Sequence, residues 1–366
     1  MKELLPLVRS YTKNSTSIIE DLKNLNIPKE AKLFAADAKS MYTNIDTGLG
    51  LATLKDFLTC NNTHLPPDFP TDFFLSIMEI VMKNNIFSFM DSYWLQLSGT
   101  AMGTPVACSY ATITYGHHEN TKILTVFEAN LLYYRRYIDD IFGIWLPPDT
   151  NETETWNNFK KELNNWGTLE WVIEEPSKET IFLDLTLNLQ NSRIYTRTYQ
   201  KEMNLYLYIP AHSAHPPSCL KGLISGEMFR YWLQNNTRDF ETILSKFIQR
   251  LTERGHQIEN LIPLFRQAAI NLSTKIATPS FPNTTTQNNN NILYLHWKYN
   301  PKGIQRNTIH RLYNEILKPH LNFTKMIIAM SRPTNLKDLL VKAALPPSKA
   351  TSPLIQEAPP DTTNPT

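Results

Sequence analysis

Two apolar, strand-like runs enclose a pair of adjacent acidic residues, and this feature limits the possible folds more than any other. The stretch YYRRYIDDIFGIW, residues 133–145, places Asp139 and Asp140 between the runs LLYYRRYI and IFGIWL. Adjacent carboxylates repel each other unless a metal ion or a basic group lies beside them. We therefore predict a hairpin with buried strands and a tip that presents both aspartates to a metal ion. A solvated turn without a metal has the same local pattern, so the decision depends on the rest of the chain.

A third aspartate, Asp37, ends another short apolar run, KLFAAD. If that run is a buried strand beside the hairpin, Asp37 lies close to Asp139 and Asp140. Carboxylate oxygens are the ligands that Mg²⁺ prefers, and three carboxylates can hold two ions. Two such ions activate an attacking oxygen and stabilise the leaving oxygen in a phosphoryl transfer. The sequence thus predicts a site for two Mg²⁺ ions, with Mn²⁺ as a possible substitute.

The composition is that of a globular protein with more than one domain. The chain has 366 residues, 42% of them hydrophobic, and its 36 basic and 34 acidic residues give a net charge of +2. This length suits two or three domains, and this charge neither requires nor excludes a polyanionic partner. Three widely spaced cysteines argue against a disulfide framework, and no apolar run is long enough to cross a bilayer. We expect an intracellular protein without membrane segments.

Hydrophobic periodicity predicts the elements around the three aspartates. Helices are predicted over residues 15–25, after a cap at Asp46 or Thr47, over 71–83, from Pro105 to about Gly116, and over 152–166. The stretch TIFLDLTLNL predicts one half-buried strand, because Ile181, Leu183, Leu185, Leu187 and Leu189 alternate with mostly polar residues. Three further segments with helical periodicity follow from about residue 220.

Five motifs, in this order, resemble the reverse transcriptases of Penelope-like retroelements: DAKSMYTNI, GTAMGTPVA, RRYIDDIF, FLDLTL and SRPTNLKDLLVKAAL. YIDD, residues 137–140, is similar to the aromatic-x-Asp-Asp box of reverse transcriptases, and DAKSMY to their first catalytic motif. The resemblance runs from about residue 5 to about residue 345. It implies an α+β fold: a right-hand polymerase palm with an antiparallel sheet, followed by a helical thumb and a basic C-terminal module.

On this resemblance the chain divides into six segments. They are a remnant of the fingers or a connection (1–30), the palm (31–200), the thumb (201–277), a low-complexity linker (278–291), the basic module (292–345) and a disordered, proline-rich tail (346–366). Residues 297–342 contain nine Lys or Arg and two acidic residues, so their net charge is +7. With its interleaved aromatic residues this module suits a nucleic acid, although a solvated helical face over a small core explains the same residues.

The resemblance also assigns roles to single residues. It implies that Asp37 and Asp139 are the principal metal ligands, and that Asp140 helps to position the metal or the primer end. Tyr42 would exclude the 2′-hydroxyl of a ribonucleotide, and Gly103 would let the backbone approach the nucleotide closely. The remaining residues would contact the template or the primer: Tyr137, Phe182, Leu183 and Asp184.

Ordinary structural roles stay open for several of these residues. Tyr42 can simply pack in the core, Gly103 can belong to a plain turn, and residues 182–184 can belong to a half-buried strand. Arg135 and Arg136 can bind phosphate, but solvation of a strand edge is the interpretation that we favour for them.

The implied activity is that of an RNA-directed DNA polymerase, with an RNA template, a DNA primer and deoxynucleoside triphosphates as partners. In a eukaryotic host we expect it in the nucleus. The alternative is an inactive, truncated or co-opted fragment that binds nucleic acid, because the part before Asp37 is short for a fingers region and no GIY-YIG endonuclease sequence follows. An RNA-templated RNA polymerase is a third candidate, against which Tyr42 argues.

Overall fold

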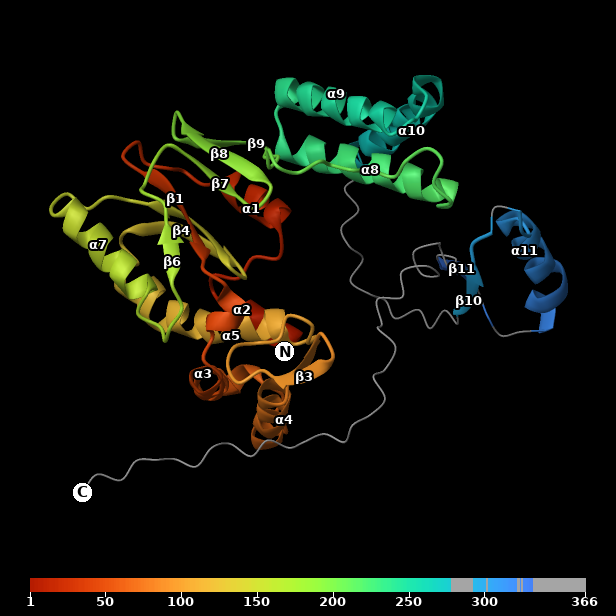
Figure 1. Ribbon diagram of the computed structural model, residues 1–366. Coiled ribbons are helices and arrows are strands. Elements are labelled where there is room, and N and C mark those ends of the chain that lie inside the picture. Colours follow the sequence, from red (N-terminus) through yellow and green to blue (C-terminus); the bar gives the residue numbers. More distant parts are fainter. Residues whose placement is uncertain (278–291, 301, 321–322, 324, 332–366) are drawn as a thin grey trace. The chain divides into compact units, whose positions relative to one another are not determined.

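The computed structural model describes residues 1–277, 292–300, 302–320, 323 and 325–331 (Figure 1). They form two units. The first comprises Met1–Tyr208 and Ile224–Leu272, and the second comprises Ile209–Leu223 and the described part of Ser273–Thr366. The predicted linker (278–291) and the predicted tail (346–366) lie outside the described residues, as do residues 332–345 of the basic module. The six segment boundaries therefore stay predictions.

A four-stranded antiparallel sheet in the order β4-β5-β1-β6 lies at the centre of the first unit. Its strands are β1 (Lys32–Ala38), β4 (Leu131–Tyr137), β5 (Asp140–Trp145) and β6 (Trp171–Ile173). β4 and β5 form the hairpin that the sequence predicts, and β1 pairs with β5 along six residues. The predicted hairpin and its neighbouring buried strand are confirmed.

Helices cover one face of this sheet (Figure 1): α5 (Ala107–His118) and α7 (Glu152–Leu163), with α3 (Thr47–Cys60) packed on α5. Phe34 of β1 and Trp145 of β5 both meet Trp156 and Phe159 of α7, with ring centroids 5.0 to 5.3 Å apart. The apolar side of the helix predicted over 152–166 thus packs against the sheet. Such aromatic contacts add to the stability that burial alone provides.

The opposite face of the sheet packs against α1 (Ser15–Leu22) and a second sheet, β7-β8-β9. The strands of this sheet are β7 (Glu179–Phe182), β8 (Leu185–Gln190) and β9 (Arg193–Thr198). The single strand predicted for TIFLDLTLNL is wrong, because Leu183, with a φ of 54°, and Asp184 form a turn between two strands. The apolar alternation continues through this turn since Leu183 also packs on the core, and it conceals the break.

The remaining predicted helices are present, and side-chain caps explain two of their starts. Asn14 accepts a hydrogen bond from the Ser17 amide at the start of α1, and Asp46 accepts one from the Leu49 amide at the start of α3. α5 begins two residues after Pro105 instead of at it. The other helices of the first part of the chain are η1 (Lys2–Leu7), α2 (Met41–Asn44), η2 (Asn62–His64), α4 (Thr71–Lys83), η3 (Glu119–Ile123) and α6 (Leu124–Val126).

The helical region predicted from residue 220 consists of α8 (Pro217–Gln234), α9 (Thr237–Glu253) and α10 (Ile258–Ala277). Within the second unit, β10 (Ile292–Lys298) and β11 (Lys325–Ser331) pair in parallel, and the other elements are α11 (Arg306–Leu312), η4 (Tyr313–Leu317) and η5 (Lys318–His320). Ile309 and Tyr313 form a small core there with Met326 and Ile328. None of the helices that the structure describes combines the length and the apolar character needed to cross a bilayer.

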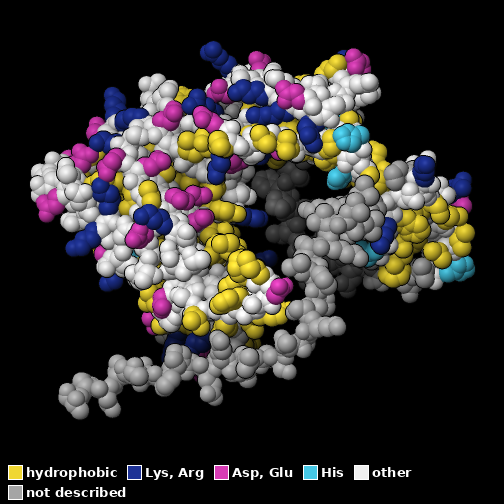
Figure 2. All heavy atoms as spheres, in the orientation of Figure 1, with side chains coloured by type: hydrophobic (Ala, Val, Ile, Leu, Met, Phe, Trp, Pro, Cys, Tyr) yellow, Lys and Arg dark blue, Asp and Glu magenta, His cyan; other side chains and the backbone are white. Residues whose placement is uncertain are grey.

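Exposed hydrophobic side chains gather on α4 and on the hairpin of β2 (Ile86–Phe89) and β3 (Ser92–Leu95), and Figure 2 shows such side chains over this region. The more exposed of them include Phe73, Ile80, Ile86, Phe89, Tyr93 and Trp94. Asp91 is the single charged residue between positions 84 and 106. The hairpin itself therefore offers no basic side chain to a polyanion, and the lysine at the end of α4, Lys83, is paired with Glu79.

Gly143 is the position of β5 at which the packing leaves no room for a side chain. A methyl group on its Cα would lie 2.3 Å from two ring atoms of Phe34, which is fully buried. We expect Gly143→Ala to lower the free energy of unfolding by about 3 kcal/mol, as overpacking in a rigid core does. Urea unfolding would measure this, with Gly226→Ala in α8 as the control, because that site has open space around it. Equal stability of the two variants would contradict the packing described here.

Candidate active site

Asp37, Asp139 and Asp140 lie at one end of the central sheet. The antiparallel register of β1 and β5 places Asp37 directly opposite Asp140. Asp139 precedes Asp140 in the turn of the hairpin, and its backbone carbonyl accepts a hydrogen bond of 2.8 Å from the Ala38 amide. The backbone of the turn is thus tied to the end of β1. Carboxylates from two distant parts of the sequence share one site because these two strands are neighbours.

The site is unfavourable for negative charge. Burial raises the pKa of Asp140 to about 6, and the charges of Asp139 and Asp37 add to that rise. Burial and then the charge of Asp139 raise the pKa of Asp37 as well. The positive charge of Lys201 opposes both shifts. Carboxylates held close together in this way are common at functional sites, because a protein that did not need them would be more stable without them.

The carboxylate oxygens of this site are suitable ligands for a divalent ion, although the side chains do not form a ready-made metal site. Among the residues that the structure describes, no three His, Cys, Asp or Glu side chains form a group that could hold a metal ion. Asp37 and Asp140 instead face each other across the two strands, and each affects the pKa of the other. Oxygen ligands are those that Mg²⁺ and Mn²⁺ prefer, and a cation removes the repulsion between carboxylates. Binding of an ion would therefore relieve the repulsion that raises the pKa values of Asp37 and Asp140.

The raised pKa of Asp140 makes Asp140→Asn a stabilising substitution in the absence of metal. Because the pKa of Asp140 in the folded protein, about 6, lies above its ordinary value of 3.8, ionisation of Asp140 costs stability as the pH rises from about 4 to 6. With EDTA at pH 8 we expect Asp140→Asn to raise the free energy of unfolding by about 1–3 kcal/mol, and at pH 3 hardly at all. Urea unfolding at both pH values measures this. Asp149→Asn, at an exposed site, is the control, and a gain that does not depend on pH would refute the explanation.

Tyr42 lies in α2 beside this group of acids. Its hydroxyl is 3.1 Å from the sulfur of Cys108 in α5. Burial, followed by the hydrogen bond to Cys108, raises the pKa of Tyr42, and the charges of Asp139 and Tyr137 contribute. Tyr42 is partly buried and packs at the rim of the main core. The side chain thus packs on the core close enough to Asp139 to feel its charge. Packing is confirmed, and the exclusion of a ribose 2′-hydroxyl stays a prediction.

The glycine that is conformationally required in the neighbouring loop is Gly99. It has a φ of 80°, and a methyl group on it would lie 2.6 Å from the backbone oxygen of Tyr42. Gly103, the predicted nucleotide-binding residue, lies in a turn before α5, and a methyl group there would meet no atom within 4 Å. Sequence reasoning singled out Gly103 and overlooked that Gly99 holds the loop against Tyr42. A ligand-binding role for Gly103 stays a prediction.

The predicted template and primer residues have different surroundings. Tyr137, at the end of β4, pairs with Asp140 across the hairpin and is 36% exposed. Phe182 is buried, with its ring centroid 5.7 Å from that of Phe142. The Asp184 carboxylate accepts hydrogen bonds from Arg230 (3.0 Å) and Gln234 (2.7 Å) of α8. Residues 182–184 thus join the turn to the core and to α8, and of the four predicted residues Tyr137 lies beside the acids.

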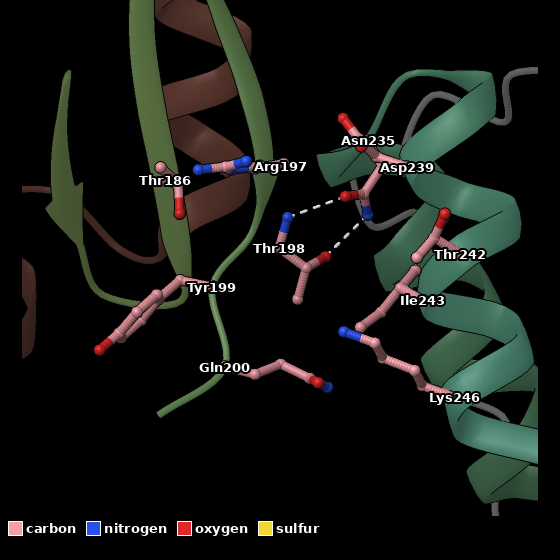
Figure 3. A pocket seen from close by; sticks show the side chains of 10 residues that line it. All are labelled: Thr186, Arg197, Thr198, Tyr199, Gln200, Asn235, Asp239, Thr242, Ile243 and Lys246. Carbon is pink, nitrogen blue, oxygen red and sulfur yellow. Dashed lines mark hydrogen bonds between the residues drawn. The ribbon is translucent and has the colours of Figure 1, made fainter. Parts of the chain in front are cut away.

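A polar pocket of about 310 Å³ lies where β9 approaches α8 and α9 (Figure 3). The Thr198 amide donates to the Asn235 side-chain oxygen (2.8 Å), and the Asn235 side-chain nitrogen donates to the Thr198 hydroxyl (2.7 Å), as the dashed lines show. Gln234 donates to Asp184 and accepts from the Thr198 hydroxyl (2.8 Å). The sheet β7-β8-β9 is therefore bonded to the C-terminal half of α8 at two places, the 182–184 turn and Thr198 of β9.

The prediction that Arg136 is solvated at a strand edge is wrong. Its guanidinium is neither at a solvated edge nor free for phosphate, because the side chain is completely buried and paired with Glu119, which is also completely buried. The prediction that Arg136 lies at a strand edge is correct for the sheet, because β4 is its edge strand. Residues 10–12 cover this edge, however: Tyr11 pairs with Arg136, and the Arg136 amide donates to the Ser10 carbonyl. Arg135, in contrast, is partly exposed and contacts Asp21 at 3.3 Å.

Comparison with known proteins identifies the fold. No protein-family model and no curated protein matches the sequence. Among solved structures, the telomerase from Candida albicans, solved with a fragment of telomeric RNA, matches with a TM-score of 0.51 and 13% identity, over 77% of this chain and 52% of that chain. A telomerase from Candida tropicalis (TM-score 0.42, 12% identity, 76% and 46% covered) and an RNA polymerase complex of a double-stranded RNA virus (0.46, 13%, 63% and 22%) also match.

The chain thus spans about half the length of the Candida albicans telomerase chain. The likeness confirms the predicted fold class, an α+β right-hand polymerase fold with an antiparallel palm sheet followed by helices. At 13% identity it concerns the fold alone, and it gives no support to the narrower Penelope-like assignment.

Proposed function

We propose that this chain is the polymerase part of an RNA-directed DNA polymerase from a retroelement of the Penelope-like type. The observation that carries the proposal is the register of β1 and β5, which sets Asp37 opposite Asp140 beside Asp139, at the end of a polymerase-type sheet. The five ordered motifs support the retroelement origin. A nuclear location in a eukaryotic host belongs to the same proposal.

The proposed reaction is attack of a primer 3′-hydroxyl on the α-phosphate of a deoxynucleoside triphosphate, with pyrophosphate leaving. When bound, two Mg²⁺ or Mn²⁺ ions would activate the attacking oxygen and stabilise the leaving one. Asp37 and Asp139 would hold the ions, with Asp140 as the adjacent carboxylate. The hydrogen bond between the Asp139 carbonyl and the Ala38 amide fixes the turn against β1. Lys201 supplies a nearby positive charge, which lowers the pKa of Asp37 and of Asp140 against the other effects.

Tyr42 is proposed to select deoxynucleotides by blocking the space of a ribose 2′-hydroxyl. We expect Tyr42→Ala to improve the use of ribonucleotides relative to deoxynucleotides by a factor on the order of 10² or more, because the steric obstacle is removed. The ratio of kcat/KM values for the two nucleotides measures this. Tyr42→Phe retains the ring and lacks the bond to Cys108, so it should keep the discrimination. Unchanged selectivity in Tyr42→Ala would leave Tyr42 with a packing role only.

A second candidate function is binding of nucleic acid without catalysis. One observation favours it: the described side chains form no group of three ligands that could hold a metal ion. Six of the basic residues predicted for the C-terminal module lie among the described residues: Lys298, Lys302, Arg306, Arg311, Lys318 and Lys325. Binding through such side chains would weaken steeply with salt.

The two candidates are distinguished by one assay on the 366-residue chain. A DNA primer annealed to an RNA template is incubated with deoxynucleoside triphosphates and Mg²⁺ or Mn²⁺, and extension is followed together with binding at several salt concentrations. Extension that requires the divalent ion supports the polymerase. Salt-dependent binding with no extension, and no stabilisation of the protein by Mg²⁺, supports the binding protein and overturns the polymerase proposal for this chain.

A further inference from the structure

The buried pair of Arg136 and Glu119 lies directly behind the turn that carries the acids. We propose that it is a positioning device: Arg136 holds the peptide group between Ile138 and Asp139 in one orientation, and thereby aims the Asp139 carboxylate at the site. The structural part of this inference stands on contacts alone. Its consequence for catalysis rests on the proposed polymerase function.

Arg136 uses four hydrogen bonds to connect three elements. Its Nε and Nη2 donate to the two carboxylate oxygens of Glu119, both at 2.8 Å. Nη2 also donates to the Thr112 carbonyl of α5 at 2.8 Å, and Nη1 donates to the Ile138 carbonyl at 2.8 Å. The planar guanidinium fixes the directions of these donors relative to one another. The position of the Ile138 carbonyl is therefore set by α5 and by Glu119, which follows α5 directly.

Glu119 is itself fixed from several sides. The Tyr134 hydroxyl donates to one of its carboxylate oxygens at 2.9 Å, and the Ser10 hydroxyl donates to the other. The Arg136 guanidinium also lies 5.2 Å from the ring centroid of Tyr115. Each charged group is fully buried, and such burial is tolerated only when nearly every polar atom has a partner. The pair thus forms a rigid anchor.

The anchored carbonyl belongs to the one residue of the turn with an unusual backbone. Ile138 has a φ of 55°, a left-handed conformation that is a true outlier for a β-branched residue. Strain of this kind persists where the surroundings hold it. Because a peptide unit is planar, fixing the Ile138 carbonyl also fixes the Asp139 amide nitrogen and Cα. The Ala38 amide holds the Asp139 carbonyl on the other side of that Cα, so the two contacts together set the direction in which the Asp139 side chain leaves the turn.

This arrangement differs from a buried ion pair that serves stability alone. Such a pair needs only the contacts between Arg136 and Glu119. Here Arg136 also donates a hydrogen bond to the turn, at the Ile138 carbonyl. Arg136→Lys separates the two roles, because a compact ammonium group cannot reach Glu119 and the Ile138 carbonyl with the fixed directions of a guanidinium. Arg135→Lys is the matched control: that arginine contacts the Arg9 carbonyl and Asp21, not the turn.

Hydrogen exchange of the turn is the first readout, and it does not require activity. We expect the amides of residues 138–141 to exchange about tenfold faster in Arg136→Lys than in the wild type, while amides in the middle of β1 and β5 keep their protection. Arg135→Lys should leave both unchanged. If Arg136→Lys does not fold, the double variant Arg136→Met/Glu119→Leu removes the pair without an unpaired charge and should show the same faster exchange in the turn.

Steady-state kinetics is the second readout. We expect kcat for nucleotide incorporation to fall on the order of 10²-fold in Arg136→Lys, with KM for the nucleotide changed far less. The reason is that displacement of the Asp139 carboxylate disturbs the geometry of the reacting atoms more than it disturbs nucleotide binding. Unchanged exchange of the turn in a folded variant, or equally faster exchange throughout the sheet, overturns the inference. A faster-exchanging turn in a protein whose wild type incorporates no nucleotide sustains the positioning role and refutes the polymerase function.

Discussion

Asp139→Asn is expected to reduce nucleotide incorporation by a factor on the order of 10³, because a metal ligand in such a site contributes several kcal/mol to the transition state. Asparagine keeps the size of the side chain and loses its charge. The backbone bond from the Ala38 amide to the residue 139 carbonyl does not involve the side chain, so the turn should keep its conformation. Extension of a DNA primer on an RNA template, under single-turnover conditions, measures the effect.

Two comparisons make this result specific. Asp149→Asn removes a carboxylate from an exposed loop of the same unit and should leave incorporation unchanged. Circular dichroism and the unfolding midpoint of Asp139→Asn should match those of the wild type or exceed them, since one source of repulsion on Asp140 and Asp37 is removed. Full incorporation by Asp139→Asn would eliminate the assigned two-metal mechanism, whatever the fold.

The parts of the fold that the sequence predicted well are those in which local pattern and tertiary packing agree. The periodicity of residues 71–83 gave the bounds of α4, and the two apolar runs around Asp139 gave the hairpin of β4 and β5. Asp37 was associated with the hairpin because it, too, ends an apolar run. The structure adds the register that makes Asp37 face Asp140, which no local pattern contains.

The errors have a common physical cause, namely contacts between segments far apart in the sequence. The turn at Leu183 was overlooked because an apolar turn residue that packs on the core continues the alternation of the strands on either side. Arg136 looked like an edge residue because its cover, residues 10–12, lies more than 120 positions earlier. Gly99 has its role through the backbone of Tyr42. In each case the deciding partner is absent from the local window.

These contacts also explain how the structure maintains an unfavourable group of charges. The pKa values of Asp37 and Asp140 are raised, so the site costs stability whenever its carboxylates are ionised without a counter-charge. Directly behind it, Arg136 and Glu119 neutralise each other in a fully bonded network. The strained turn is therefore held by a buried ion pair whose side chains are bonded to several elements.

Among the substitutions considered, removal of one member of that pair should cause the largest loss of stability. We expect Arg136→Met to lower the free energy of unfolding by about 3–5 kcal/mol, because Glu119 is then a buried charge without a partner and the Ile138 and Thr112 carbonyls lose their donor. Urea unfolding followed by circular dichroism measures this. Arg135→Met, which removes a partly exposed arginine from the adjacent position, should cost about 1 kcal/mol or less.

The double variant Arg136→Met/Glu119→Leu decides what the pair contributes. Apolar side chains of similar size fill the space without a desolvated charge, so most of the lost stability should return. Because both variants lack the donor to Ile138, the difference in stability between them isolates the cost of an unpaired carboxylate from the cost of a free turn. A double variant as unstable as Arg136→Met would mean that the carbonyl contacts, and not the buried charge of Glu119, account for the loss.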